Sequence, residues 1–244
     1  MRLDKLLVDR GLAPTRERAR ALILAGRVNV GERAVTKAGT TIPLDAAVVL
    51  STPDHPYVGR GGLKLAHALD VFGVSVEGRL ALDIGASTGG FTDVLLRRGA
   101  TSVIALDVGR GQLDWRLRSD SRVIVRERTN ARSLAAADLP HAVDLVSIDV
   151  SFISLRHILP VVPPLLTPGA DVVALVKPQF EAGRDEVGKG GLVMDPVVHQ
   201  EVVARVIRDG EAAGLTLVDR TESPITGATG NREFFVHFRR AARS

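Results

Sequence analysis

Residues 82–91 read Leu82-Asp83-Ile84-Gly85-Ala86-Ser87-Thr88-Gly89-Gly90-Phe91, and this stretch decides the fold of the 244-residue chain. An apolar strand runs into a glycine-rich turn, and a helix is expected to begin directly after the turn. Ligands of parallel sheets bind at the carboxyl ends of the strands, near such turns. The spacing is G-x-x-x-G rather than the dinucleotide fingerprint G-x-G-x-x-G, and no G-K-[ST] follows. A P-loop is therefore excluded.

On both sides of this stretch, predicted strands alternate with predicted helices. The strands are expected at residues 80–84, 103–107, 123–125, 144–149, 171–177, 215–220 and 233–238. The helices are expected at residues 62–72, 91–98, 196–213 and, interrupted by prolines, 155–166. The alternation predicts an α/β fold with a doubly wound, mostly parallel seven-stranded sheet. Only a loop separates the last two strands, so the sheet ends in a β-hairpin, as in the class I, Rossmann-like methyltransferase fold.

The first fifty residues follow a different pattern. Apolar spacing predicts a short helix at residues 3–11 and a second helix capped by Thr15, followed by short strands. Residues 51–56, Ser-Thr-Pro-Asp-His-Pro, have the composition of a linker. We therefore predict a small α+β domain with its linker at residues 1–58 and a larger domain at residues 59–244.

The composition excludes several classes of protein. Hydrophobic residues make up 45% and charged residues 25%, which is typical of a globular chain and excludes wholesale disorder. Cysteine is absent, which excludes disulfide scaffolds, iron–sulfur clusters and cysteine nucleophiles. No apolar run approaches the length of a membrane span, and no signal peptide is recognisable, so a cytoplasmic protein without a membrane partner is expected. The histidines form no metal-spaced pair, so no metal site is predicted.

Positive charge is concentrated in the small domain. The chain has 32 basic and 28 acidic residues, net +4, and residues 1–58 hold nine basic and six acidic ones, net +3. This favours nucleic-acid binding by the small domain. The candidate phosphate contacts lie on or just beyond its second helix, and a solvated helix surface is the alternative: Arg16, Arg18, Arg20 and Arg27. A simple division of labour follows, in which residues 1–58 bind RNA and contribute nothing to cofactor binding.

Polar residues at the strand ends indicate a nucleoside ligand. Asp107 ends the strand after the glycine turn, about twenty residues further on, where its carboxylate can accept hydrogen bonds from both hydroxyls of an adenosine ribose. Asn130, after the third strand, is a candidate for the adenine. The pattern looks like a site for S-adenosylmethionine, and a tight turn without a ligand is the alternative. The predicted cofactor residues are Asp83, Gly85, Ala86, Ser87, Thr88, Gly89, Gly90, Phe91, Asp107 and Asn130.

Lysine is rare in this chain, at five of the 32 basic residues. A GC-rich genome explains this bias, but a lysine kept in such a background also suggests a site where arginine cannot substitute. Lys177 ends a buried strand, and a partly desolvated lysine, unlike arginine, can give up its proton. Lys177 is therefore a candidate general base, with a surface lysine as the alternative. Asp149, Glu233 and Lys64 are expected to converge on the same end of the sheet.

The whole chain resembles the TlyA (haemolysin A) family of ribosomal RNA methyltransferases. Residues 1–50 resemble the S-four-type RNA-binding domain, and the larger domain is similar to FtsJ-type RNA 2′-O-methyltransferases, which carry a Lys-Asp-Lys-Glu tetrad. In the linker, Tyr57 stands where some members carry tryptophan. The motifs that carry the resemblance are the glycine turn, Arg60-Gly61-Gly62-Leu63-Lys64-Leu65, Ser147-Ile148-Asp149-Val150-Ser151-Phe152-Ile153-Ser154-Leu155, Val176-Lys177-Pro178-Gln179-Phe180-Glu181 and Gly230-Asn231-Arg232-Glu233-Phe234-Phe235.

The resemblance implies methyl transfer from S-adenosylmethionine to a ribose 2′-hydroxyl of ribosomal RNA, at a cytidine of the large-subunit RNA or also of the small-subunit RNA. It implies a tetrad of Lys64, Asp149, Lys177 and Glu233, in which Lys177 takes the hydroxyl proton or holds the developing alkoxide. The implied partners are ribosomal RNA and ribosomal subunits. Two alternatives are a non-catalytic ribosome-assembly factor, which the filled tetrad opposes, and a haemolysin-type membrane-active protein. The sequence shows no long basic amphipathic helix of the kind that binds a membrane surface, which opposes the second alternative.

Overall fold

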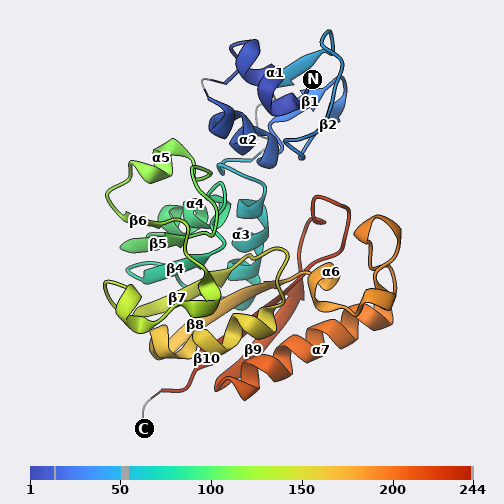
Figure 1. Cartoon of the computed structure of the whole chain (residues 1–244). Coiled ribbons are helices and arrows are strands. Elements are labelled where there is room, and N and C mark those ends of the chain that lie inside the picture. Colours follow the sequence, from blue (N-terminus) through green and yellow to red (C-terminus); the bar gives the residue numbers. More distant parts are fainter. Residues whose placement is uncertain (14, 51–54, 243–244) are drawn as a thin grey trace.

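The computed structural model describes residues 1–13, 15–50 and 55–242. These residues form a three-stranded and a seven-stranded sheet, which belong to the small N-terminal domain and to the larger domain. In Figure 1 the small domain sits beside α3 and α5 of the larger one. Its antiparallel sheet has the order β2-β1-β3. The elements of the small domain are α1 (Leu3–Asp9), α2 (Arg16–Leu24), β1 (Val28–Val30), β2 (Arg33–Ala34) and β3 (Val48–Leu50).

The second helix of the small domain begins where the sequence predicts. The hydroxyl of Thr15 accepts a hydrogen bond from the backbone N–H of Arg18 at 3.1 Å, which caps α2. The carboxylate of Asp4 is completely buried and pairs with Arg2 and Arg16. The hydrogen bond from Arg2 is the main reason that the pKa of Asp4 is lowered to about 2. This small core therefore keeps α1 and α2 together with both apolar packing and a buried charge.

The larger sheet has the strand order β6-β5-β4-β7-β8-β10-β9. Strands β4 to β8 pair in parallel, and β10 runs antiparallel to both β8 and β9. This is the predicted α/β sheet with its terminal hairpin, so the fold prediction is confirmed. The strands are β4 (Leu80–Ile84), β5 (Ser102–Leu106), β6 (Val123–Arg126), β7 (Val143–Ile148), β8 (Leu166–Val176), β9 (Leu215–Glu222) and β10 (Phe234–Arg240).

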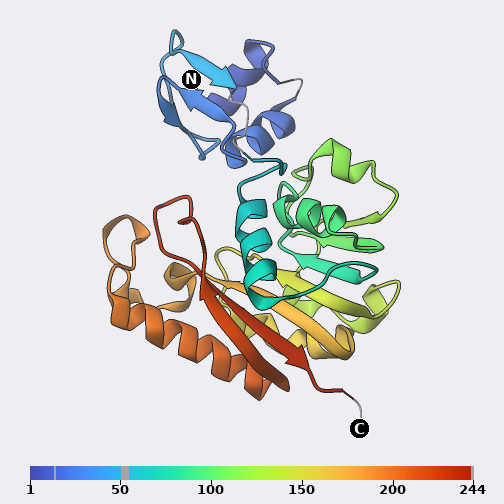
Figure 2. The same cartoon turned by 180° about the vertical axis from the view of Figure 1, so that it is seen from behind.

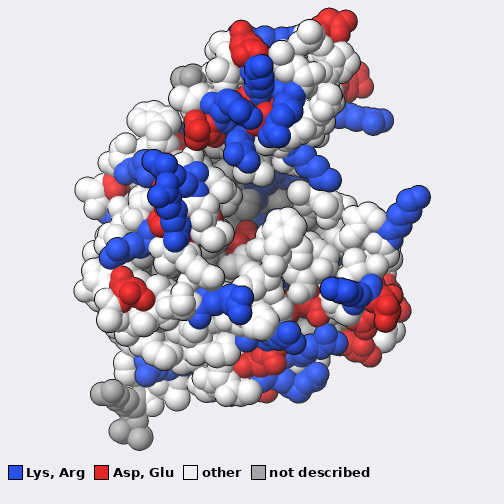
Figure 3. Space-filling model, in the orientation of Figure 1, with Lys and Arg blue, Asp and Glu red and all other residues white. Residues whose placement is uncertain are grey.

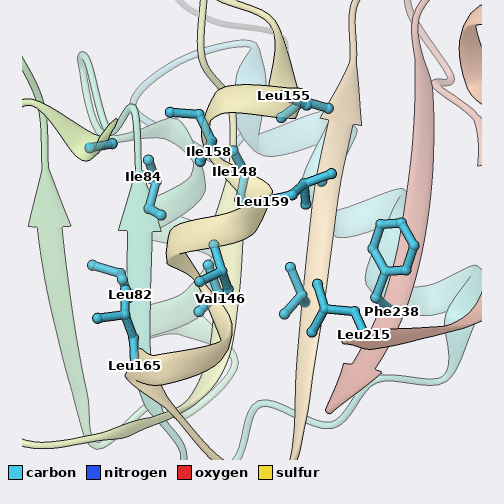
Figure 4. Close-up of a cluster of buried hydrophobic side chains, with 14 of the residues drawn as sticks. Leu82, Ile84, Val146, Ile148, Leu155, Ile158, Leu159, Leu165, Leu215 and Phe238 are labelled. Carbon is cyan, nitrogen blue, oxygen red and sulfur yellow. The ribbon is translucent and has the colours of Figure 1, made fainter. Parts of the chain in front are cut away.

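Helices cover both faces of this sheet. One buried cluster lies under α7 and the chain between β7 and β8, where Leu82, Val146 and Leu159 meet (Figure 4). The other lies under α3 and α4, which Figure 2 shows from behind. The parallel strands β4, β5, β7 and β8 are buried on both faces along their apolar runs, whereas the edge strand β6 is partly exposed. The helices are α3 (Gly61–Phe72), α4 (Gly90–Arg97), α5 (Trp115–Arg118), α6 (Pro178–Glu181) and α7 (Pro196–Ala212).

The segment between β7 and β8 differs from the expected helix at residues 155–166. It consists of three 3₁₀ turns, because three prolines there lack the N–H that an α-helix needs. The strand β8 also begins at Leu166, five residues before the predicted start. The 3₁₀ turns of the larger domain are Ala131–Ser133, Ala136–Asp138, Leu155–His157, Leu159–Val161, Pro163–Leu165, Arg184–Glu186 and Lys189–Gly191.

The end of the predicted linker is anchored on the larger domain. Residues 51–54 lie outside the described residues. After them, the backbone N–H of Val58 donates to Asp93 Oδ2 at 2.9 Å. The ring of Tyr57 lies so close to Gly62 that a Cβ there would stand 2.3 Å from it. Residues 57–58 thus pack on α3 and α4, while the boundary at residue 58 stays a prediction. Among the described helices, none has both the length and the apolar character that crossing a membrane requires.

Candidate active site

The glycine turn connects β4 to α4 through tight backbone contacts. Gly85 has φ +88°, and a Cβ added there would lie 2.3 Å from the carbonyl oxygen of Asp149. Gly90 begins α4 so close to α3 that an added Cβ would lie 3.0 Å from the backbone nitrogen of Gly62. Glycine at these positions lets β7 and α3 approach the turn.

Two lysine–carboxylate pairs lie at this end of the sheet. The Nζ atom of Lys177 is 2.6 Å from Asp149 Oδ1 and donates a hydrogen bond to Ser151 Oγ at 2.9 Å. The Lys177–Asp149 contact is a close ion pair. The Nζ atom of Lys64 donates to Glu233 Oε2 at 2.5 Å. Both lysine side chains are 12% exposed, which keeps them out of bulk water.

The sheet itself brings these four residues together. Asp149 follows β7, and its N–H bonds to Ile84 O at 2.9 Å, next to the glycine turn. Lys177 follows β8 directly, and Glu233 directly precedes β10, whose first residue pairs with the last residue of β8. Lys64 lies near the start of α3, which crosses above the turn. All four predicted tetrad residues are therefore found at one end of the sheet.

A small cavity of about 160 Å³ lies between the turn and one residue of each pair, whereas Lys177 and Glu233 do not line it. Lys64 and Asp149 line it together with most of the turn: Gly85, Ala86, Ser87, Thr88, Gly90 and Phe91. A larger cavity of about 490 Å³ adjoins it, and Gly85, Ser87 and Asp149 line both. Asp107 and Asn130 line the larger one. Its volume lies in the range of ligand sites, roughly 300–1,000 Å³.

The residues of the larger cavity suit a nucleoside ligand. Asp107 Oδ2 accepts the N–H of Ser87 at 2.7 Å, and its Oδ1 accepts the N–H of Gly109 at 2.6 Å. These bonds fix the carboxylate at the cavity wall, where each oxygen keeps lone pairs for a ribose. The side-chain oxygen of Asn130 caps the following 3₁₀ turn by accepting the N–H of Arg132. Apolar side chains complete the wall, including Leu106, Ile153 and Ile158.

Two predicted cofactor residues do not reach either cavity wall. Gly89 lies behind the turn, packed on Leu117. Asp83 is completely buried and accepts hydrogen bonds from Thr92 Oγ1 at 2.7 Å and from Ser147 Oγ at 2.9 Å. Burial raises the pKa of Asp83 to about 7, while these hydrogen bonds act in the opposite direction. Asp83 therefore connects β4 to β7 and α4 through hydrogen bonds beneath the turn.

This carboxyl group predicts a pH-dependent stability. In the unfolded chain Asp83 ionises near pH 4, whereas the folded chain retains its proton up to about pH 7. The free energy of unfolding should therefore fall between these values, by at most about 1.4 kcal/mol per pH unit from this group. We expect Asp83→Asn, which cannot ionise, to gain stability relative to the unsubstituted chain as the pH rises from 5 to 7. Urea unfolding at several pH values measures this difference, and parallel stability curves would contradict it.

The four predicted phosphate contacts are placed differently from one another. Arg16 pairs with Asp4, and Arg18 pairs with Asp114 of the larger domain at 3.0 Å. Arg20 is exposed, whereas Arg27 is half-buried and its Nε has no hydrogen-bond partner among the described residues. Figure 3 shows basic side chains on the small domain above the hollow between the domains. Arg18 is thus already engaged within the chain.

Several residues at the site were not predicted, among them Ser151, Phe152 and Leu24. Ser151 is a hydrogen-bond partner of Lys177. Phe152 is 91% exposed, has φ +64° and lines the larger cavity. The sequence pattern that could have indicated Phe152 is its position three residues after Asp149, at the carboxyl end of a strand. Leu24 of the small domain lines both cavities, and no sequence pattern signals this. A separate cavity of about 600 Å³ beside α7 contains none of the predicted site residues.

Known proteins match both parts of the chain. The model of the S4 domain matches residues 1–48. The 16S/23S rRNA (cytidine-2′-O)-methyltransferase TlyA of Mycobacterium tuberculosis is 47% identical over 98% of this chain and 89% of its own length. Hemolysin A of Brachyspira hyodysenteriae is 42% identical over 98% and 99% of the two chains.

A solved structure supports the same assignment. A Streptococcus thermophilus protein that bears the name hemolysin superposes with a TM-score of 0.78 at 43% identity, covering 99% of this chain and 88% of its own. The family model for FtsJ-like methyltransferases matches residues 57–240, which confirms the predicted enzyme class. The chain therefore belongs to the FtsJ-like methyltransferases and carries an S4 domain at its N-terminus.

Proposed function

We propose that this protein transfers a methyl group from S-adenosylmethionine to a ribose 2′-hydroxyl of ribosomal RNA. The observation that carries the proposal is the pair of contacts Lys177–Asp149 and Lys64–Glu233, of which Asp149 and Lys64 line a cavity beside the glycine turn. The family match supports methyl transfer. Filled lysine and carboxylate positions argue against a non-catalytic assembly factor, which has no need for them.

The larger cavity is the site proposed for the methyl donor. Asp107 would hold the ribose hydroxyls, Asn130 would contact the adenine, and the turn residues would contact the rest of the ligand. When bound, S-adenosylmethionine supplies a methyl group on a positively charged sulfur. Because this methyl is already activated, alignment of the acceptor hydroxyl supplies much of the rate acceleration.

The tetrad prepares the acceptor oxygen. Lys177 would contact the 2′-hydroxyl. As a neutral amine it would take the hydroxyl proton, and the resulting ammonium would stabilise negative charge on the oxygen as the oxygen–methyl bond forms and the sulfur–methyl bond breaks. Asp149 and Ser151 hold the Nζ atom of Lys177 in place through the contacts at 2.6 and 2.9 Å. Lys64, itself held by Glu233, lines the smaller cavity together with Asp149 and would position the ribose.

Other features of the chain fit an RNA substrate. A 2′-hydroxyl occurs in RNA and not in DNA, and the exposed ring of Phe152 offers a surface on which an unstacked base can lie. The S4 domain would bind the surrounding RNA through Arg16 and Arg20. The M. tuberculosis relative is named for cytidines of both ribosomal RNAs. We therefore propose a ribosomal cytidine, methylated in the cytoplasm.

The test is transfer of a tritiated methyl group to purified ribosomal RNA, followed by alkaline hydrolysis. A 2′-O-methyl group blocks cleavage of the adjacent phosphodiester, so the label is expected in alkali-resistant dinucleotides. Label in mononucleotides would mean base methylation and would contradict the proposal. DNA of the same sequence serves as the control and should take up no label.

A further inference from the structure

A leucine of the small domain reaches the site of the larger domain. Leu24 ends α2 and lines both the tetrad cavity and the larger cavity at the turn. Its neighbour Ala25 and Thr36 of the same domain line the tetrad cavity. Three other residues are common to both cavities, namely Gly85, Ser87 and Asp149. Leu24 therefore lies over the junction where the two cavities meet.

An ion pair between the domains holds α2 in this position. Arg18, less than two helical turns before Leu24, contacts Asp114 Oδ2 through its guanidinium at 3.0 Å. Asp114 is 5% exposed and caps α5 by accepting the N–H of Arg116. The backbone N–H of Asp114 in turn donates to Thr88 O at 3.1 Å. The carboxylate that holds α2 is thus attached to the glycine turn itself.

The rest of the contact between the domains lies along the same helix. Ala21 and Leu22 of α2 face Val58, Thr88 and Asp114 across a narrow space of about 10 Å³. On the adjoining loop, Gly26 is close enough to Arg60 that an added Cβ would lie 3.4 Å from its Cδ. The small domain is therefore packed against the turn, with Leu24 at the edge of that contact.

We infer that Leu24 is a binding-site residue for the methyl donor and that the site is complete only when Arg18 seats the small domain on Asp114. An apolar side chain over the junction covers the donor and excludes water from the place where methyl transfer would occur. The inference rests on the proposed function for the identity of the donor. It replaces the simple division of labour, in which residues 1–58 contribute nothing to cofactor binding.

The test is calorimetric titration of the full chain with S-adenosylhomocysteine, without RNA. We expect Leu24→Ala to weaken binding about 3- to 10-fold, because a leucine side chain loses its contact with the ligand. Leu44→Ala is the matched control: Leu44 is 63% exposed in the same domain and lines neither cavity. Leu24→Met, which keeps a side chain of similar volume, should bind more tightly than Leu24→Ala. Equal affinity of Leu24→Ala and the unsubstituted chain would overturn the inference.

The role of the Arg18–Asp114 ion pair is tested by Arg18→Ala and by the double variant that combines Arg18→Ala with Leu24→Ala. Because loss of the ion pair moves Leu24 off the junction, Arg18→Ala should weaken binding to a similar extent, and the two effects should not add. Additive losses of affinity in the double variant would overturn the inferred role of the Arg18–Asp114 ion pair. Thermal unfolding of each variant identifies any loss of folding. Absence of binding to the unsubstituted chain would refute the proposed function, whereas normal binding with an unaffected Leu24→Ala would refute this inference alone.

Discussion

Lys177→Ala is expected to lower methyl transfer to ribosomal RNA by about 10³-fold or more while leaving cofactor binding intact. The Nζ atom lies 2.6 Å from Asp149 and the side chain is 12% exposed, so its removal leaves no other cation at that position. The cofactor cavity itself is lined by other residues. Single-turnover methyl transfer and calorimetric binding of S-adenosylhomocysteine measure the two effects separately.

A second substitution separates the two roles of Lys177. Lys177→Arg keeps the positive charge but cannot give up a proton at neutral pH, so an inactive variant supports proton removal. Substantial activity would assign the residue a purely electrostatic role. Lys189→Ala is the control, because Lys189 is exposed and forms no ion pair with Asp149 or Glu233 among the described residues. Turnover of Lys177→Ala at the rate of this control would rule out Lys177 as a catalytic residue.

Gly85→Ala is expected to destabilise the fold by about 3 kcal/mol or more and to abolish cofactor binding. The added methyl group would stand 2.3 Å from Asp149 O, and φ +88° already disfavours a side chain. The collision is relieved only if Asp149 and the turn move apart, and this movement disrupts the Lys177–Asp149 ion pair and both cavities. Urea unfolding and calorimetry measure the two losses.

Another glycine provides the control for this experiment. Gly73 ends α3 with φ +63°, and an added Cβ meets no atom within 4 Å. Gly73→Ala therefore introduces the backbone strain without the collision and should cost about 1 kcal/mol. Equal destabilisation by the two substitutions would show that the approach of Asp149 is not what requires glycine at position 85.

The sequence predicts the larger domain well because its elements are periodic. Three of the strands contain apolar runs that are followed directly by a polar residue, namely Asp107, Asp149 or Lys177. Parallel pairing puts the carboxyl ends of these strands at one edge, so the convergence of Lys177 and Asp149 follows from topology alone. Prolines, by contrast, replaced the helix expected at residues 155–166 with 3₁₀ turns.

Periodic sequence patterns do not predict side-chain contacts between segments that are far apart in the sequence. The burial of Asp83 depends on Thr92 and Ser147, which lie 9 and 64 residues away. The engagement of Arg18 by Asp114 joins residues 96 positions apart. Spacing on one helix shows that Arg18 is available for a phosphate, but not that a carboxylate of another domain already holds it.

The Arg18–Asp114 pair has a thermodynamic consequence for the order in which ligands bind. An RNA phosphate that binds Arg18 competes with the carboxylate of Asp114, and displacement of that carboxylate would unseat Leu24. If such an RNA lowers the affinity of the protein for the methyl donor, a saturating concentration of the donor must lower the affinity for that RNA by the same factor. This holds because the coupling between two binding sites is reciprocal. An RNA that contacts only Arg16 and Arg20 escapes this antagonism, so either partner can arrive first.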